Sequence, residues 1–228
     1  MRLRIVFSKS GALRYIGHLD LQSVWERTVR RAGLPLAYSQ GFHPSPKIQI
    51  ASALPLGTIG LAEIVDLWLD EPLADTQVGQ YADMLQFAAP PGLSIVSVEE
   101  VDDHGPALQT RMASAEYTVT LLDAVDVPDL QRRLEALLAA TSLPRQRRGK
   151  EYDLRPLIEE LSLALFGLPP FSDITEHPVE KEGSRVFMRL AAREGAAGRP
   201  DEVLDALGIL LESTRIERTH LILKDEIK

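Results

Sequence analysis

The succession of strand and helix periodicities constrains the fold of this chain more than any single motif does. From Arg2 to Lys9, apolar and polar residues alternate as in a strand, with the apolar residues on one face. From His18 to Ala32, the apolar residues recur at helical spacing instead. The strand face comprises Leu3, Ile5 and Phe7, opposite Arg2, Arg4 and Ser8, and the helix face comprises Leu21, Val24, Trp25, Val29 and Ala32. This change of period predicts a strand followed by an amphipathic helix that stops at Gly33.

The same two periodicities continue along the chain. Strands are predicted over residues 47–54, 61–70 and 93–101, and a helix over 74–88, so this part of the sequence reads β-α-β-β-α-β. That order is the split βαβ motif of ferredoxin-like domains. Residues 102–112 include Gly105 and Pro106 and are predicted to form a linker.

The pattern restarts after this linker. Strands are predicted over residues 116–122, 158–165, 185–192 and 215–224, with helices from Asp126 and over 200–211. We therefore predict an α+β protein with two ferredoxin-like halves, residues 1–106 and 107–228, each an antiparallel sheet covered by helices. Trp25 and Trp68 lie on apolar faces and are predicted to belong to the core.

Charge is distributed unevenly along this acidic chain. The net charge is −8, and residues 51–104 hold ten carboxylates and no lysine or arginine. Residues 8–47 are instead basic, and only Asp20 and Glu26 oppose their cations. The basic side chains are Lys9, Arg14, His18, Arg27, Arg30, Arg31, His43 and Lys47. A basic cluster kept against the overall balance indicates an anionic partner at one face.

The arginines near the end of the first helix and the loop that follows it are candidate binding elements. The spacing of Arg27, Arg30 and Arg31 places them on one exposed helix face. The alternative interpretation is an ordinary solvated face. Two prolines restrict the GFHPSP loop, so Phe42 and His43 are predicted to lie at a groove or a rigid loop tip. The candidate binding residues of this half are Lys9, Arg14, Arg27, Arg30, Arg31, Phe42, His43 and Lys47.

A second basic run, RQRRGKEYDLR, lies in the other half of the chain. Its candidate binding residues are Arg147, Arg148, Lys150, Tyr152 and Arg155. Arginine forks suit phosphate groups, and a tyrosine ring can stack on a base. The alternative is a flexible surface connection. If the two halves face each other, the two basic runs line one groove.

Three residues are weak candidates for a metal or acid–base centre: His18, Asp20 and His43. Their spacing matches no established metal-site pattern, and Asp20 equally suits the first turn of a helix, where a carboxylate favours the dipole. The sequence contains no cysteine, which excludes thiolate zinc sites, disulfides and cysteine-ligated iron–sulfur clusters within it. We therefore predict that the chain holds no cofactor.

The segments LRYIGHLDL, RRAGLPLAYSQGFHPSPKI, ASALPLG and KEYDLRPLIEEL resemble a bacterial family of radical-SAM-linked proteins that carry domain of unknown function 2344. The resemblance is strongest over residues 2–70 and implies a radical SAM protein as partner. The duplicated ferredoxin-like plan is also similar to the RNA-processing (RAMP) proteins of CRISPR systems. The C-terminal glycine-rich loop typical of those endonucleases is absent, so RNA cleavage is not expected.

These observations together predict an accessory protein rather than an enzyme. We expect a non-catalytic module that presents a phosphate-bearing substrate, namely RNA such as tRNA or ribosomal RNA, to a partner radical SAM enzyme. One alternative is a metal-dependent or acid–base enzyme acting on a nucleic acid or phosphate ester. Another is a protein–protein adaptor that uses the acidic residues of 63–103. No apolar run is long enough to span a membrane and no secretory signal is visible, so we expect a cytoplasmic protein.

Overall fold

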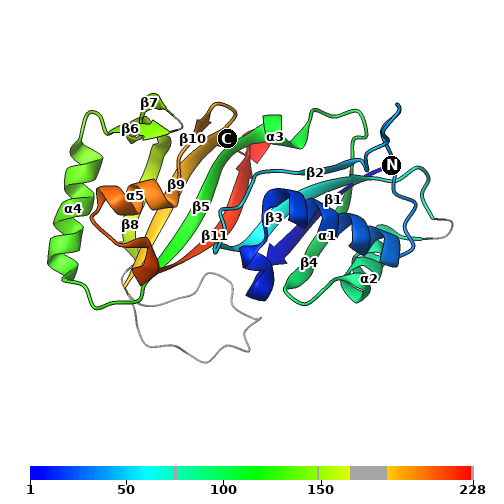
Figure 1. The fold of residues 1–228 in the computed structure, drawn as a ribbon, viewed down its shortest axis with the longest axis horizontal. Coiled ribbons are helices and arrows are strands. Elements are labelled where there is room, and N and C mark those ends of the chain that lie inside the picture. Colours follow the sequence, from blue (N-terminus) through cyan, green and yellow to red (C-terminus); the bar gives the residue numbers. More distant parts are fainter. Residues whose placement is uncertain (74–75, 148, 165–183, 227–228) are drawn as a thin grey trace. The chain divides into compact units, whose positions relative to one another are not determined.

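The structure is a computed structural model, and it describes residues 1–73, 76–147, 149–164 and 184–226. The fold is mixed α+β, and its strand pairs are mostly antiparallel (Figure 1). The chain divides into two compact units. Unit 1 consists of residues 1–115, 192–196 and 217–228, and unit 2 of residues 116–191 and 197–216. The division of the chain into domains of residues 1–106 and 107–228 stays a prediction.

Unit 1 is built on a sheet whose strand order is β4-β1-β3, with β2 also paired to β3. These strands are β1 (Arg2–Lys9), β2 (Ile48–Ile50), β3 (Ile59–Trp68) and β4 (Leu93–Val101). Every pair among them is antiparallel. Strand β11 (Thr214–Leu223) adds a short parallel contact, in which Glu217 and Arg218 pair with Ile59 and Gly60.

Two helices cover one face of this sheet, α1 (His18–Arg31) and α2 (Val78–Ala88). The strand residues predicted to face inward, Leu3, Ile5 and Phe7, are fully buried against them. Trp25 of α1 is also fully buried, and its ring meets that of Phe7 edge to face with centroids 4.9 Å apart. The predicted helix phase and the placing of Trp25 in the core are confirmed.

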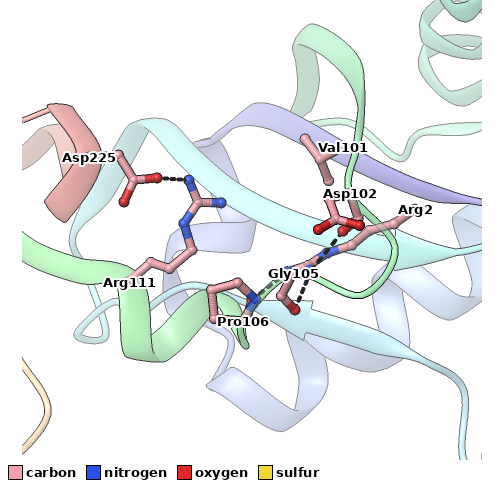
Figure 2. Close-up of a pocket in the computed structure, with 7 residues that line it drawn as sticks. All are labelled: Arg2, Val101, Asp102, Gly105, Pro106, Arg111 and Asp225. Carbon is pink, nitrogen blue, oxygen red and sulfur yellow. Dashed lines mark hydrogen bonds and ion pairs between the residues drawn. The ribbon is translucent and has the colours of Figure 1, made fainter.

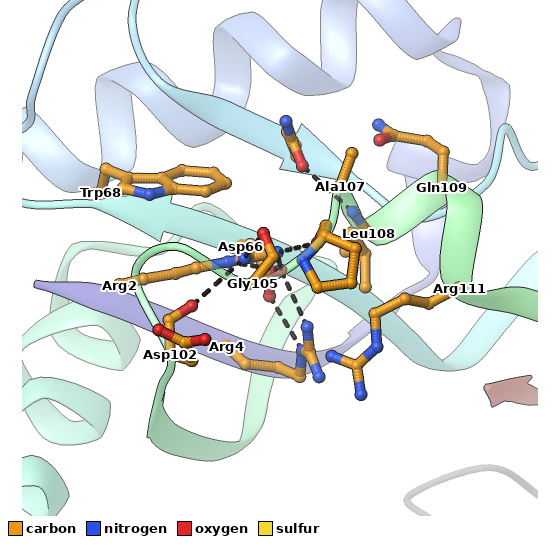
Figure 3. Close-up of polar contacts among 12 residues, drawn as sticks. Arg2, Arg4, Asp66, Trp68, Asp102, Gly105, Ala107, Leu108, Gln109 and Arg111 are labelled. Atoms are coloured by element: carbon orange, nitrogen blue, oxygen red, sulfur yellow. Dashed lines mark hydrogen bonds and ion pairs between the residues drawn. The ribbon is translucent and has the colours of Figure 1, made fainter. Parts of the chain in front are cut away.

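On the opposite face of the sheet, the parts of β1 and β3 that carry Arg2, Arg4 and Asp66 are buried as well, which the alternation of β1 does not predict. Arg2 and Arg4 are 1% and 6% exposed, and Asp66 between them is fully buried (Figure 3). The predicted linker covers them, because Arg2 donates to the carbonyl oxygens of Asp102, Gly105 and Pro106. This segment continues into the short helix α3 (Leu108–Arg111), whose Leu108 is fully buried. The segment is therefore part of unit 1 rather than a free linker.

Trp68 departs from its predicted core position. It is only partly buried, and the guanidinium of Arg2 lies over its ring, 4.6 Å from the centroid. Arg2 and Trp68 are direct cross-strand partners in the β1–β3 register, which explains the stacking. Trp68 therefore packs on the buried polar face of the sheet and not in the apolar core.

Unit 2 contains two longer antiparallel strands, β8 (Ile158–Ala164) and β9 (Arg185–Arg193), and β9 also neighbours β5 (Met112–Leu121) and β10 (Ala196–Ala197). Its helices are α4 (Val127–Ala139) and α5 (Pro200–Ala206). Asp126 caps α4 as predicted, because its carboxylate accepts from the N–H of Asp129 at 3.1 Å. Much of the second basic run lies in an antiparallel pair of short strands, β6 (Pro144–Arg147) and β7 (Lys150–Asp153).

Candidate functional site

The last turns of α1 carry two exposed arginines that the fold does not use. Arg27 and Arg31 are i, i+4 neighbours on one ridge, and neither contacts a partner among the described residues. Arg30, between them, is held differently. It pairs with Glu26 at 2.8 Å and donates to the hydroxyl of Tyr38 at 3.1 Å. The hydrogen bond to Tyr38 is the main reason that the pKa of Arg30 lies above its usual value.

The GFHPSP loop is closed at its base by backbone hydrogen bonds. The N–H of Ser39 donates to the carbonyl of Ser45 at 2.8 Å, and the N–H of Ser45 donates to the Ser39 hydroxyl at 2.9 Å. Tyr38 and Pro46 form a β-bridge directly below. Phe42 lies at the tip with a relative exposure of 103%, and His43 beside it is exposed. The predicted position at an exposed loop tip is confirmed.

Tyr38 connects the loop to the helix. Its hydroxyl bonds Arg30 and also Glu26, at 3.4 Å, so the base of the loop lies against the last turns of α1. Lys47 follows the loop, is exposed, and has no side-chain partner among the described residues. It lies opposite Trp68, one residue before Ile48, whose side chain faces the core under α1, so strand alternation directs Lys47 to the other face of the sheet. We call the region on the α1 side the α1–loop surface; it comprises Arg27, Arg30, Arg31, Phe42 and His43.

Lys9 does not belong to this surface, contrary to expectation. It is 1% exposed, and its ammonium donates to the carbonyl of Ile16 at 3.0 Å. Burial lowers the pKa of Lys9, while the nearby carboxylate of Glu63 opposes the shift. Glu63 in turn forms a buried ion pair with Arg218. Lys9 therefore holds the segment before α1 in place and does not face solvent.

Arg14 is also separate from the arginines of α1. It lies in the 3-10 helix η1 (Gly11–Tyr15), before α1, and its guanidinium covers the neighbouring Tyr15 ring at 4.7 Å. The 14 residues of α1 span about 20 Å, so Arg14 and Arg31 sit at opposite ends of the helix. The basic residues of 8–47 thus do not form one patch.

The weak metal candidates do not assemble either. His18 and Asp20 are exposed in the first turn of α1, and the Asp20 carboxylate accepts from the N–H of Gly17 at 3.4 Å. His43 lies on the loop beyond the other end of the helix. Across the described ranges, no group of three histidine or acidic side chains is placed to hold a metal ion.

The second basic run is used largely inside unit 2. Arg147 pairs with Glu202 of α5, donates to the carbonyl of Ala197, and lies over the Tyr152 ring at 4.7 Å. Burial and hydrogen bonding to Glu202 raise the pKa of the Tyr152 phenol. Glu202 accepts from the Arg147 guanidinium although it lies 55 residues away in the sequence, and that guanidinium covers one face of the Tyr152 ring. A binding role for Arg147 and Tyr152 stays a prediction.

Arg155 and Asp153 complete this internal network. Arg155 donates to the carbonyl of Leu138 at 2.8 and 3.1 Å, which satisfies the C-terminal end of α4, and to the carbonyl of Ile158. The carboxylate of Asp153 accepts from the N–H groups of Leu143 and Arg155, and these bonds lower its pKa. Of the remaining candidates, Lys150 is exposed at the hairpin and Arg148 lies outside the described residues.

A hollow of about 250 Å³ also lies in unit 1, below the segment that covers the outer face of the sheet (Figure 2). Arg2 and Arg111 line it, together with Val101, Asp102, Gly105, Pro106 and Asp225. Every nitrogen of the Arg2 guanidinium already has an acceptor, and Arg111 pairs with Asp225. The two arginines that line this hollow therefore already have partners within the protein. The α1–loop surface is the stronger candidate site.

Sequence reasoning missed the buried pairs Arg2–Asp66 and Glu63–Arg218. The charged residues in the otherwise apolar strand β3 were the available signal, since an ionised group within a buried strand requires a partner. Within the described residues, no helix is long and apolar enough to cross a membrane.

Comparison with curated proteins finds no match to the chain. A family model described as an uncharacterized protein conserved in bacteria (DUF2344) matches residues 2–200, which include most of each unit and the whole α1–loop surface. The chain therefore belongs to the DUF2344 family.

Proposed function

We propose that this chain is a non-catalytic module that binds a phosphate-bearing substrate, RNA, on its α1–loop surface. The observation that carries the proposal is that Arg27 and Arg31 are exposed and unpaired among the described residues of a chain whose net charge is −8. An unpaired guanidinium keeps its planar fork of donors free for phosphate oxygens. Arg147 and Arg155 of the second basic run, by contrast, have internal partners.

The proposal extends to a partner enzyme that acts on the bound RNA. A radical SAM enzyme needs a cluster with cysteine ligands, and this sequence has no cysteine. The resemblance to radical-SAM-linked proteins supports such a partner. The module would then hold the substrate while the partner supplies the chemistry.

The strand arrangement of unit 1 supports a ferredoxin-like interpretation of this module. The element order is β1-α1-β2-β3-α2-β4, and the strands lie in the order β4-β1-β3-β2 with antiparallel neighbours. Likeness of fold to RNA-processing proteins is an analogy and says little about function. The exposed cations carry the functional argument.

Filter binding with tRNA and with ribosomal RNA at salt concentrations from 50 to 200 mM tests the proposal. Each phosphate contact contributes about 0.7–0.9 to the slope of log K against log salt, so Arg27→Gln/Arg31→Gln should reduce the slope by about 1.5. Arg185→Gln/Arg199→Gln removes the same charge from exposed positions of unit 2 that have no ion pair among the described residues, and it is the matched control. Weak binding without salt dependence, or equal loss in both variants, would refute the proposal.

A further inference from the structure

We infer that the α1–loop surface selects single-stranded RNA and stacks one unpaired base on the ring of Phe42. This inference rests on the proposed function and adds the form of the ligand. It starts from the loop tip, where a large apolar ring is 103% exposed beside a cationic surface. The ring faces of nucleic-acid bases stack on aromatic side chains with little regard to sequence.

The loop presents Phe42 in a fixed way. Hydrogen bonds between Ser39 and Ser45 close the base of the loop. Gly41 has a φ of 136°, a conformation that residues with side chains rarely adopt, and it turns the chain just before Phe42. Pro44 and Pro46 restrict the returning strand. A loop backbone held in this way loses little conformational entropy on binding, so only the side-chain torsions of Phe42 remain to be ordered when its ring stacks.

The cations next to the loop are few and close to its base. Arg27 and Arg31 form one ridge of α1, and Tyr38 holds the loop against that helix. Two unpaired cations suit a few phosphates of one strand. Residues 51–104 hold ten carboxylates and no lysine or arginine, so they add no basic track for the closely spaced phosphates of a duplex.

A duplex also hides the surfaces that Phe42 would contact. In A-form RNA the bases are stacked on each other, and the major groove is too deep and narrow for side chains to read. A loop, bulge or free end offers an unstacked base, so no base has to be removed from a duplex before it stacks on Phe42. The combination of an exposed ring and a small cationic patch therefore favours single strands.

The test is a fluorescence anisotropy titration with a labelled 12-nucleotide RNA of mixed sequence, alone and annealed to its complement, at 100 mM salt. The single strand should bind at least about tenfold more tightly than the duplex. Phe42→Ala should weaken single-strand binding about tenfold, which corresponds to 1.4 kcal/mol. Phe42→Trp should retain binding, and RNA should quench its added emission.

Phe87→Ala is the matched control, because Phe87 is 96% exposed on α2, outside the α1–loop surface. Equal binding of strand and duplex, unaffected by Phe42→Ala but still weakened by Arg27→Gln/Arg31→Gln, would overturn this inference and leave the proposed function standing. Absence of RNA binding at every salt concentration would overturn both. A Phe42-dependent adsorption to vesicles of anionic phospholipid, without RNA binding, would instead make the loop a membrane contact and overturn both.

Discussion

The buried carboxylate of Asp66 offers the sharpest test of how unit 1 is held together. Its oxygens accept from Arg2 at 2.6 and 3.1 Å and from Arg4 at 2.9 Å twice (Figure 3). Arg4 and Asp66 are direct cross-strand partners, and all three side chains are buried. Asp66→Asn keeps the shape of the side chain but removes the charge that balances two guanidinium groups.

The expected loss is large because no other carboxylate hydrogen-bonds to either guanidinium among the described residues. At an effective dielectric constant of about 20, each charge pair near 4 Å contributes roughly 4 kcal/mol. Water that enters the site, and the hydrogen bonds that the asparagine amide oxygen still accepts, offset part of this lost charge interaction. Removing one partner of a buried pair typically costs about 3–5 kcal/mol. For a chain of this length, that corresponds to a fall in Tm of roughly 6–20 °C.

Urea denaturation followed by tryptophan fluorescence measures this loss. Both tryptophans, Trp25 and Trp68, lie in unit 1, so the signal reports that unit. Asp83→Asn on α2 is the control, because it removes an exposed carboxylate. A change of less than about 0.5 kcal/mol for Asp66→Asn, equal to that of the control, would show that Arg2 and Arg4 are well hydrated. The description of the outer face as a buried polar layer would then be wrong.

Three further outcomes follow from the contacts of single residues. Trp25→Ala should lower the free energy of unfolding by about 3–5 kcal/mol in urea, whereas Arg31→Glu should change it by less than about 0.5 kcal/mol. Arg155→Met should cost about 1–3 kcal/mol, measured the same way, because the carbonyl of Leu138 loses its partner. Hydrogen bonds hold the pKa of Asp153 below its ordinary 3.8, so it stabilises the fold above that pH and loses this effect as pH falls further. Asp153→Asn should therefore flatten the acid limb of a stability-against-pH curve, and an unchanged limb would contradict the assignment.

Periodicity predicted the long elements of the fold well. The strand over residues 93–101 coincides with β4, and the strand at the N-terminus and the helix of residues 18–32 match β1 and α1 closely. The last predicted helix was too long, since α5 ends at Ala206. Gly208, with a φ of 67°, stops it, because the left-handed conformation breaks the helical backbone.

Short and non-local features were beyond this reasoning. Strand β2 is only Ile48–Ile50, and the β6–β7 hairpin carries charged residues on both strands, so neither has a clear alternation. The burial of Arg2 and Arg4 depends on a segment about a hundred residues later in the chain. Local sequence shows the two faces of a strand, but it does not show what covers them.

The same limit explains why some of the predicted site residues are exposed and unpaired while others have internal partners. Arg31 and Arg147 look alike in sequence, since each lies in a basic run. Arg147 is paired because α5 brings Glu202 to it, and Arg31 has no acidic residue three or four positions away. Local spacing identifies a charge that has no helical partner. Only the tertiary structure identifies a partner distant in sequence.

The energetic cost of the free arginines is too small to demand a function by itself. Arg27 and Arg31 repel each other by roughly a few tenths of a kcal/mol, and the negative end of the α1 dipole offsets part of that. What requires explanation is their segregation from the carboxylates of residues 51–104. Residues 51–104 carry ten carboxylates and no lysine or arginine, so they repel RNA and favour its binding at the α1–loop surface instead. A surface with few phosphate contacts also binds weakly enough to release its ligand, which suits a module that passes RNA to another enzyme.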